Sequence, residues 1–125
     1  MRAYYFGYSL GGVFGAYTLL AQPDTFKNYI LGSPALNGDI PYLTELATNT
    51  EIKRNGLNAN VFIAYGSLEE RLATYADKFI SLLKERDDKS LSLTHVVVEG
   101  NHSQAFPITG IRSVTWLSAL SSDKE

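Results

Sequence analysis

The chain contains no cysteine, which excludes disulfide bonds, thiolate metal sites and a cysteine nucleophile. It also lacks an excess of charge: 11 basic and 13 acidic side chains give a net charge of −2, which argues against a nucleic-acid or anionic-membrane surface built on bulk charge. No apolar run reaches membrane-spanning length and no signal peptide is visible. The compartment stays open, with the cytoplasm as the default and a periplasmic or secreted protein as the alternative.

Predicted strands and helices alternate along the 125 residues, which are enough for one domain with a core. Short apolar runs predict strands, and apolar residues at helical spacing predict helices. The alternation predicts an α/β fold, with a parallel sheet and helices on both of its faces. The expected strands are 3–6, 26–31, 61–65 and 91–98, and the expected helices are 9–21, 41–55, 69–86 and 105–120.

The first junction between a strand and a helix carries a G-x-S-x-G motif, Gly7-Tyr8-Ser9-Leu10-Gly11. A serine on such a tight turn has a strained backbone and an exposed hydroxyl, as a nucleophile requires. The turn also aims the Leu10 N–H at the reacting centre, where it would serve as an oxyanion donor. The alternative is a glycine-rich turn in which Ser9 is buried or caps the helix.

Histidine is scarce, and only one of the two is placed for catalysis. Ligands of a parallel sheet bind at the carboxyl ends of its strands. His102 follows the fourth strand in a Gly-Asn-His turn, so it reaches the same edge as Ser9. Imidazole titrates close to neutral pH, which makes His102 the expected base for the Ser9 hydroxyl. His95 lies inside the fourth strand and is expected to be a half-buried structural residue.

Three carboxylates follow other strands at this edge and could orient the imidazole: Glu69, Glu70 and Asp39. Their positions give the chain order serine, acid, histidine. Glu69 and Glu70 also have a simpler interpretation as acids that complement the dipole of the following helix. A serine–histidine dyad with a weakly placed acid is a further alternative.

Four segments carry a family resemblance: Gly7–Gly12, Tyr29–Pro34, Tyr65–Glu70 and Glu99–Ser103. They resemble the C-terminal half of an α/β-hydrolase, and more narrowly the esterase family that contains esterase D and the ferric-siderophore trilactone esterases. The resemblance implies a small-molecule ester substrate, no metal or organic cofactor, and a serine nucleophile at Ser9 with His102 as base. It also favours Glu69 as the acid, because the family places its acid three residues after a glycine.

The resemblance further implies that residues 1–125 form a single domain that is an incomplete hydrolase. Further strands, and the loop that donates the second oxyanion hydrogen bond, lie upstream of the nucleophile strand in that fold. The apolar first strand is then a sheet edge, through which copies of the chain are expected to associate. We expect weak or no activity from the isolated chain. The competing hypothesis is a non-catalytic or truncated relative that acts as a binding or interaction module.

Overall fold

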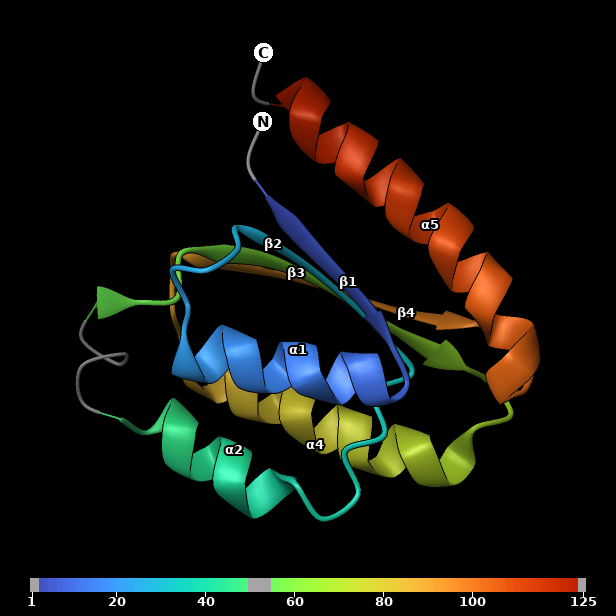
Figure 1. Ribbon diagram of the computed structural model, residues 1–125, viewed down its shortest axis with the longest axis horizontal. Helices are drawn as coiled ribbons and strands as arrows, with labels where there is room; N and C mark the ends of the chain where they lie inside the picture. The colour runs from blue at the N-terminus through green and yellow to red at the C-terminus, as the bar shows by residue number, and fades with distance from the viewer. Residues whose placement is uncertain (1–2, 50–54, 124–125) are drawn as a thin grey trace.

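The computed structural model describes residues 3–49 and 55–123 and contains a parallel sheet with helices on both faces (Figure 1). This arrangement confirms the predicted α/β class. The elements are β1 (Tyr4–Tyr8), α1 (Leu10–Ala21), β2 (Asn28–Gly32), α2 (Ile40–Ala47), β3 (Ala59–Gly66), α4 (Glu70–Glu85), β4 (Leu91–Val98) and α5 (His102–Asp123).

The four strands lie side by side in chain order, β1-β2-β3-β4, and every neighbouring pair is parallel. Right-handed crossovers that always advance in one direction place their helices on one face of the sheet. Accordingly α1, α2 and α4 lie together on one face, whereas α5 crosses the opposite face (Figure 1). The carboxyl ends of all four strands therefore meet at one edge, where the turns with the predicted site residues begin.

The main core fills the space between the sheet and the three helices on its first face, with Leu19, Leu31 and Phe79 fully buried in it. The α4 helix packs onto this core through one apolar side, on which Ala76, Phe79, Ile80 and Leu83 are buried. A smaller cluster on the opposite face consists of Ile30, Phe62 and Ala64, against which Trp116 and Leu117 of α5 pack.

Several predicted boundaries were wrong. The helix predicted over 41–55 is α2, which ends at Ala47. The Thr48 hydroxyl and the Thr48 backbone N–H both donate to the Thr44 carbonyl and close the last turn. Residues 50–54 of the predicted helix lie outside the described residues. The third strand extends beyond 61–65 because Ala59 and Gly66 also pair with β4. The last helix begins at His102, three residues before the predicted start.

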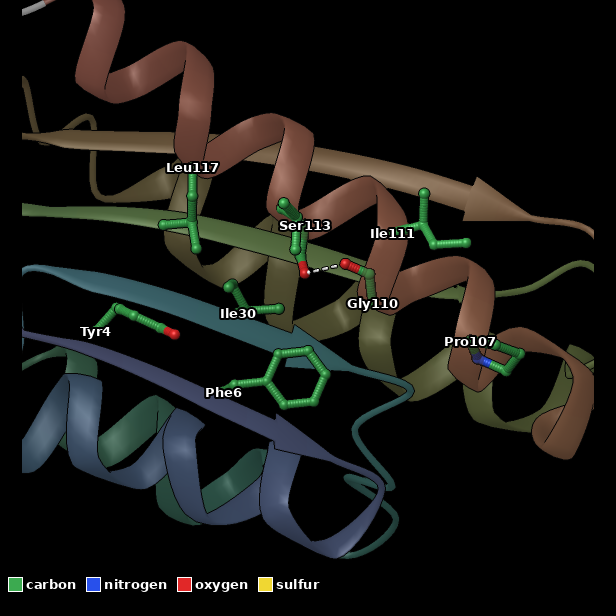
Figure 2. Close-up of a pocket in the computed structure, with 9 residues that line it drawn as sticks. Tyr4, Phe6, Ile30, Pro107, Gly110, Ile111, Ser113 and Leu117 are labelled. Atoms are coloured by element: carbon green, nitrogen blue, oxygen red, sulfur yellow. Dashed lines mark hydrogen bonds between the residues drawn. The ribbon is translucent and has the colours of Figure 1, made fainter.

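The first strand is less buried than its apolar sequence predicted. The side chains of Tyr4 and Phe6 are 48% and 39% exposed, because β1 is the edge strand of the described sheet and α5 packs on the other three strands. Between β1 and α5 lies an apolar groove of about 450 Å³ (Figure 2). The residues that line it are Tyr4, Phe6, Ile30, Pro107, Gly110, Ile111, Ser113, Val114 and Leu117.

Candidate active site

Ser9 occupies the turn between β1 and α1 with φ 59° and ψ −112°, a conformation that non-glycine residues rarely adopt. A backbone held in a sparsely populated region costs roughly 1–3 kcal/mol and persists only where its surroundings enforce it. Here the Ser9 N–H donates to the Gly32 carbonyl at 2.8 Å, which ties the turn to the end of β2. Ser9 itself is half-buried, so its hydroxyl is not sealed in the core.

The two glycines of the motif have different roles. A Cβ atom on Gly7 would collide with the Gly11 carbonyl, so the close approach of β1 and α1 requires glycine there. On Gly11 the nearest atom to such a Cβ would be the Tyr5 hydroxyl oxygen, at an ordinary 3.9 Å. The packing of the described residues therefore requires the first glycine of G-x-S-x-G and not the second.

Leu10 is the first residue of α1. The first-turn N–H groups of a helix have no acceptor within the helix, and the helix dipole adds partial positive charge around them. The Leu10 N–H consequently lies directly beside Ser9 at a site that favours negative charge. An N–H next to the serine at a helix N-terminus is where an oxyanion donor is expected.

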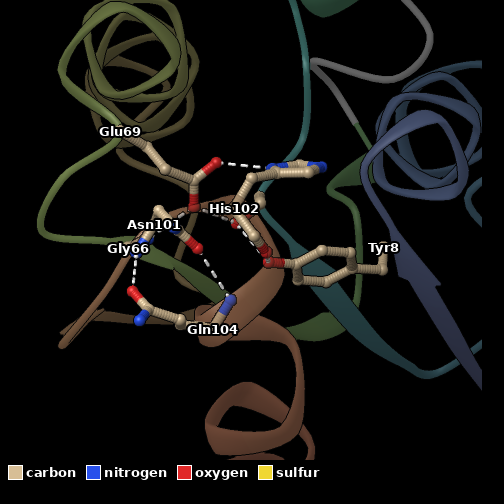
Figure 3. Close-up of polar contacts among 7 residues, drawn as sticks. Tyr8, Gly66, Glu69, Asn101, His102 and Gln104 are labelled. Atoms are coloured by element: carbon tan, nitrogen blue, oxygen red, sulfur yellow. Dashed lines mark hydrogen bonds and ion pairs between the residues drawn. The ribbon is translucent and has the colours of Figure 1, made fainter.

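Glu69 lies in the turn between β3 and α4 with its side chain only 5% exposed. A buried carboxylate needs hydrogen-bond donors, and this one has three. Its Oε1 atom accepts from the Gly66 N–H at 2.8 Å and from the Ser33 hydroxyl at 2.7 Å. Its Oε2 atom accepts from Nδ1 of His102 at 2.6 Å (Figure 3). A Cβ atom on Gly66 would lie 2.9 Å from Oε1, so glycine is needed beside the carboxylate.

His102 is held at the start of α5 by a reciprocal capping box. The Gln104 N–H donates to the Asn101 side chain, and the Asn101 N–H donates to the Gln104 side chain, both at 2.9 Å (Figure 3). The His102 ring, 46% exposed, donates through Nδ1 to Glu69, because a carboxylate can only accept. The Nε2 atom of the neutral ring then carries the lone pair, as a general base requires.

Tyr8 and Ser33 complete the polar network, although neither was among the predicted site residues. The Tyr8 hydroxyl donates to the His102 carbonyl at 2.6 Å, and the two rings pack with centroids 5.1 Å apart (Figure 3). Burial, and secondarily the Glu69 charge, raise the pKa of Tyr8 although its contact with Ser33 lowers it, so the phenol keeps its proton. A different signal was present in the sequence for α5: the spacing Asn101-x-x-Gln104 is that of a capping box and could have predicted that the helix begins at His102.

The structure separates the three candidate acids. Only Glu69 contacts His102; Asp39 accepts a hydrogen bond from the Tyr17 hydroxyl at 2.7 Å, and Glu70 is exposed in the first turn of α4. Ser9 and His102 lie at the same sheet edge, but within residues 3–49 and 55–123 no hydrogen bond joins the Ser9 hydroxyl to the ring. Catalytic hydrogen bonds are often long before substrate binds.

His95 lies in β4, away from this network; it was expected to be half-buried, but the residue is exposed, with its side chain 28% exposed. Its ring packs against that of Tyr65 with centroids 5.1 Å apart, and its Nε2 atom lies 4.0 Å from Asp77. Burial lowers the pKa of His95, reinforced by the charge of Lys84 and opposed by that of Asp77. Asp77 accepts a hydrogen bond from the Tyr65 hydroxyl at 2.7 Å.

We predict that His95→Gln flattens the pH dependence of stability without altering catalysis. Because the folded-state pKa of His95 is depressed, the unfolded chain binds more protons, and stability is lost as the pH falls below the ordinary imidazole value of about 6.5. Urea denaturation of both proteins at pH 7.5 and 5.5 measures this. The wild type should lose more stability than the variant over this range. A greater loss in the variant would mean that an ion pair with Asp77 dominates instead.

Two features are absent from the part of the chain that the structure describes. No group of three or more histidine, aspartate or glutamate side chains is arranged to hold a metal ion in residues 3–49 and 55–123. In those same residues no helix has the length and apolar character needed to cross a membrane.

Comparisons with known proteins show that this chain is similar to parts of siderophore esterases. Ferri-bacillibactin esterase BesA of Bacillus subtilis (strain 168) is 37% identical over 67 residues, which are 52% of this chain and 23% of that protein. The BES protein from Bacillus cereus has a TM-score of 0.73 at 28% identity, covering 85% of this chain and 41% of its own. Siderophore hydrolase EstA from Aspergillus nidulans has a TM-score of 0.73 at 19% identity, with 97% and 48% covered. No family model matches the chain.

The chain therefore has a partial α/β-hydrolase fold and is similar to a region of siderophore esterases, which confirms the resemblance noted in its motifs. It spans less than half the length of each of these proteins. EstA, at 19% identity, supports the fold alone.

Proposed function

We propose that this chain carries the catalytic residues of a serine hydrolase that cleaves carboxylic esters. The observation that carries the proposal is the 2.6 Å contact between a buried Glu69 and His102, at the sheet edge where Ser9 has a strained backbone. Serine nucleophiles need a base, and the base needs a group that fixes its tautomer. We assign Ser9 as nucleophile, His102 as general base and Glu69 as the group that orients it.

In this mechanism the Ser9 hydroxyl oxygen attacks the ester carbonyl carbon while its proton passes to Nε2 of His102. The carbonyl oxygen becomes an oxyanion, which the Leu10 N–H stabilises together with a second donor. The intermediate collapses, the bond to the alcohol oxygen breaks, and Nε2 returns the proton to the departing alcohol. A water molecule then attacks the carbonyl carbon of the acyl-enzyme while its proton passes to Nε2 of His102. The bond to the Ser9 oxygen breaks and Nε2 returns the proton to that oxygen, which releases the acid and restores Ser9.

For the substrate we propose the ester bonds of an iron siderophore. A relative that is 37% identical over 67 residues supports this class, since it is a ferri-bacillibactin esterase by name. Short acyl esters, acylated sugars and thioesters are the competing classes. A panel that compares kcat/KM for a trilactone siderophore with each of these separates them.

The proposed function is tested by covalent labelling with a fluorophosphonate, which reports an activated serine even where turnover is slow. Intact-mass spectrometry should show one adduct, and peptide mapping should place it on Ser9. His102→Ala should slow the labelling by several orders of magnitude, because the serine then loses its base. Absence of any Ser9 adduct at high probe concentration would remove the proposal.

A non-catalytic interaction module is the second candidate, and the apolar groove between β1 and α5 favours it. The groove is lined by Tyr4 and Phe6, and the β1 edge beside it pairs with no strand in the described residues. An unpaired, apolar edge strand is a template for association. A module would show no Ser9 adduct, while light scattering would show a dimer or larger assembly that Phe6→Lys disperses.

A further inference from the structure

We propose that Ser33 is a positioning residue: its hydroxyl fixes the carboxylate of Glu69 so that one oxygen, Oε2, faces His102. The proposal deepens the function proposed above and rests on it. Ser33 is fully buried directly after β2, and its hydroxyl lies 2.7 Å from Oε1 of Glu69. The two residues are 36 positions apart and belong to turns after neighbouring strands.

The two oxygens of Glu69 have separate partners. Oε1 accepts from the Gly66 N–H and from the Ser33 hydroxyl, whereas His102 is the only donor to Oε2 among the residues that the structure describes. Two donors on one oxygen fix the rotation of the carboxylate plane, which leaves Oε2 aimed at Nδ1. If the Gly66 N–H were the sole donor to Oε1, the carboxylate plane could still rotate about that single hydrogen bond. Outer partners that orient metal ligands change activity by about 10- to 100-fold when removed, and we expect an effect of this size for Ser33.

Tyr8 connects the same network to the backbone of His102. Its hydroxyl lies 3.1 Å from that of Ser33 and donates its proton to the His102 carbonyl. Each hydroxyl has one proton, and the two shorter contacts, at 2.7 and 2.6 Å, use them. Tyr8, the residue before Ser9, thus contacts both Ser33, which holds Glu69, and His102, which Glu69 orients.

Ser33 occupies a strained conformation, with φ 37°. Glycine would adopt this backbone without the steric cost that a Cβ atom adds. A residue selected only for the turn would therefore be glycine. That serine is found there, with its hydroxyl buried against a carboxylate, points to the hydroxyl as the reason.

The variants Ser33→Ala and Ser33→Gly separate the hydroxyl from the backbone. Both remove the hydroxyl, but only glycine also relieves the strain, so Ser33→Gly should be at least as stable as Ser33→Ala. If the hydroxyl matters, both variants should slow fluorophosphonate labelling of Ser9 by about 10- to 100-fold. Wild-type labelling by Ser33→Gly would overturn the proposal. Ser103→Ala, which alters an exposed serine beside His102, is the matched control and should label at the wild-type rate.

A second readout does not depend on Ser9. The chain has two histidines, so ¹⁵N spectra of the imidazoles are simple, and His95→Gln assigns the signals. At pH 8, where an ordinary imidazole is neutral, wild-type His102 should carry its proton on Nδ1. Both Ser33 variants should raise the fraction protonated on Nε2, and Glu69→Gln should raise it further. Tyr8→Phe, which keeps the ring contact, should have a smaller effect.

The outcomes distinguish this proposal from the proposed function. If Glu69→Gln changes the tautomer and neither Ser33 variant does, Ser33 has no positioning role, although the pairing of Glu69 with His102 stands. If the Ser33 variants change the tautomer but Ser9 forms no adduct in any protein, the positioning role stands and the hydrolase function fails.

Discussion

Replacing Ser9 with alanine should lower kcat on an activated aryl ester by on the order of 10⁴–10⁶-fold. Alanine removes the only atom that can form the acyl-enzyme and leaves the rest of the site in place. Residual hydrolysis would then come from the oxyanion donor and from binding alone. The effect should appear in kcat, with KM nearly unchanged, because the lost interaction forms in the transition state and not on substrate binding.

The control for Ser9→Ala is Ser81→Ala, since Ser81 is exposed on α4 and contacts none of the site residues described above. Circular dichroism should give the same spectrum for the wild type, Ser9→Ala and Ser81→Ala. His102→Ala should match Ser9→Ala within about tenfold, because the two residues act as a unit. Where the wild-type rate lies near background, the labelled fraction of each protein replaces the rate. Full activity in Ser9→Ala would exclude the mechanism.

Much of this site could be predicted from the order of the chain. In a parallel sheet each turn after a strand reaches the same edge, so assigning the strands already places Ser9, Glu69 and His102 together. The positions of the elements depended on apolar periodicity, which is strong in α4 and β4. For this reason β4 was predicted with its observed limits, whereas the weakly patterned segment around α2 was predicted too long.

The network behind Glu69 could not be predicted in the same way. The contact between Ser33 and Glu69 depends on the lateral distance between two turns and on a positive φ at Ser33, and neither quantity has a periodic signal in the sequence. The exposure of Tyr4 and Phe6 depends on where α5 crosses the sheet. Tertiary packing determines both the Ser33–Glu69 contact and the exposure of Tyr4 and Phe6, and neither can be predicted from local propensity.

Replacing Glu69 with glutamine should lower kcat on the order of 10⁴-fold, the effect of losing the correct imidazole tautomer. The structure gives the direction of the change. Two donors, the Gly66 N–H and the Ser33 hydroxyl, surround Oε1, so the amide oxygen of glutamine should occupy that position. Its NH₂ group then faces Nδ1 of His102 and can only donate, which favours the tautomer protonated on Nε2. In that tautomer Nε2 carries a proton and has no lone pair to accept the Ser9 proton.

Glu70→Gln and Asp39→Asn are the matched controls for this prediction. Glu70 is the exposed neighbour of Glu69, and Asp39 is bonded to Tyr17, so neither change should lower the rate by more than a few-fold. Near wild-type rates for Glu69→Gln, Glu70→Gln and Asp39→Asn alike would mean that Ser9 and His102 work as a dyad. A large loss in Asp39→Asn alone would move the acid to the turn after β2. The observed 2.6 Å contact makes Glu69 the variant expected to fail, because no other carboxylate in the described residues is bonded to His102.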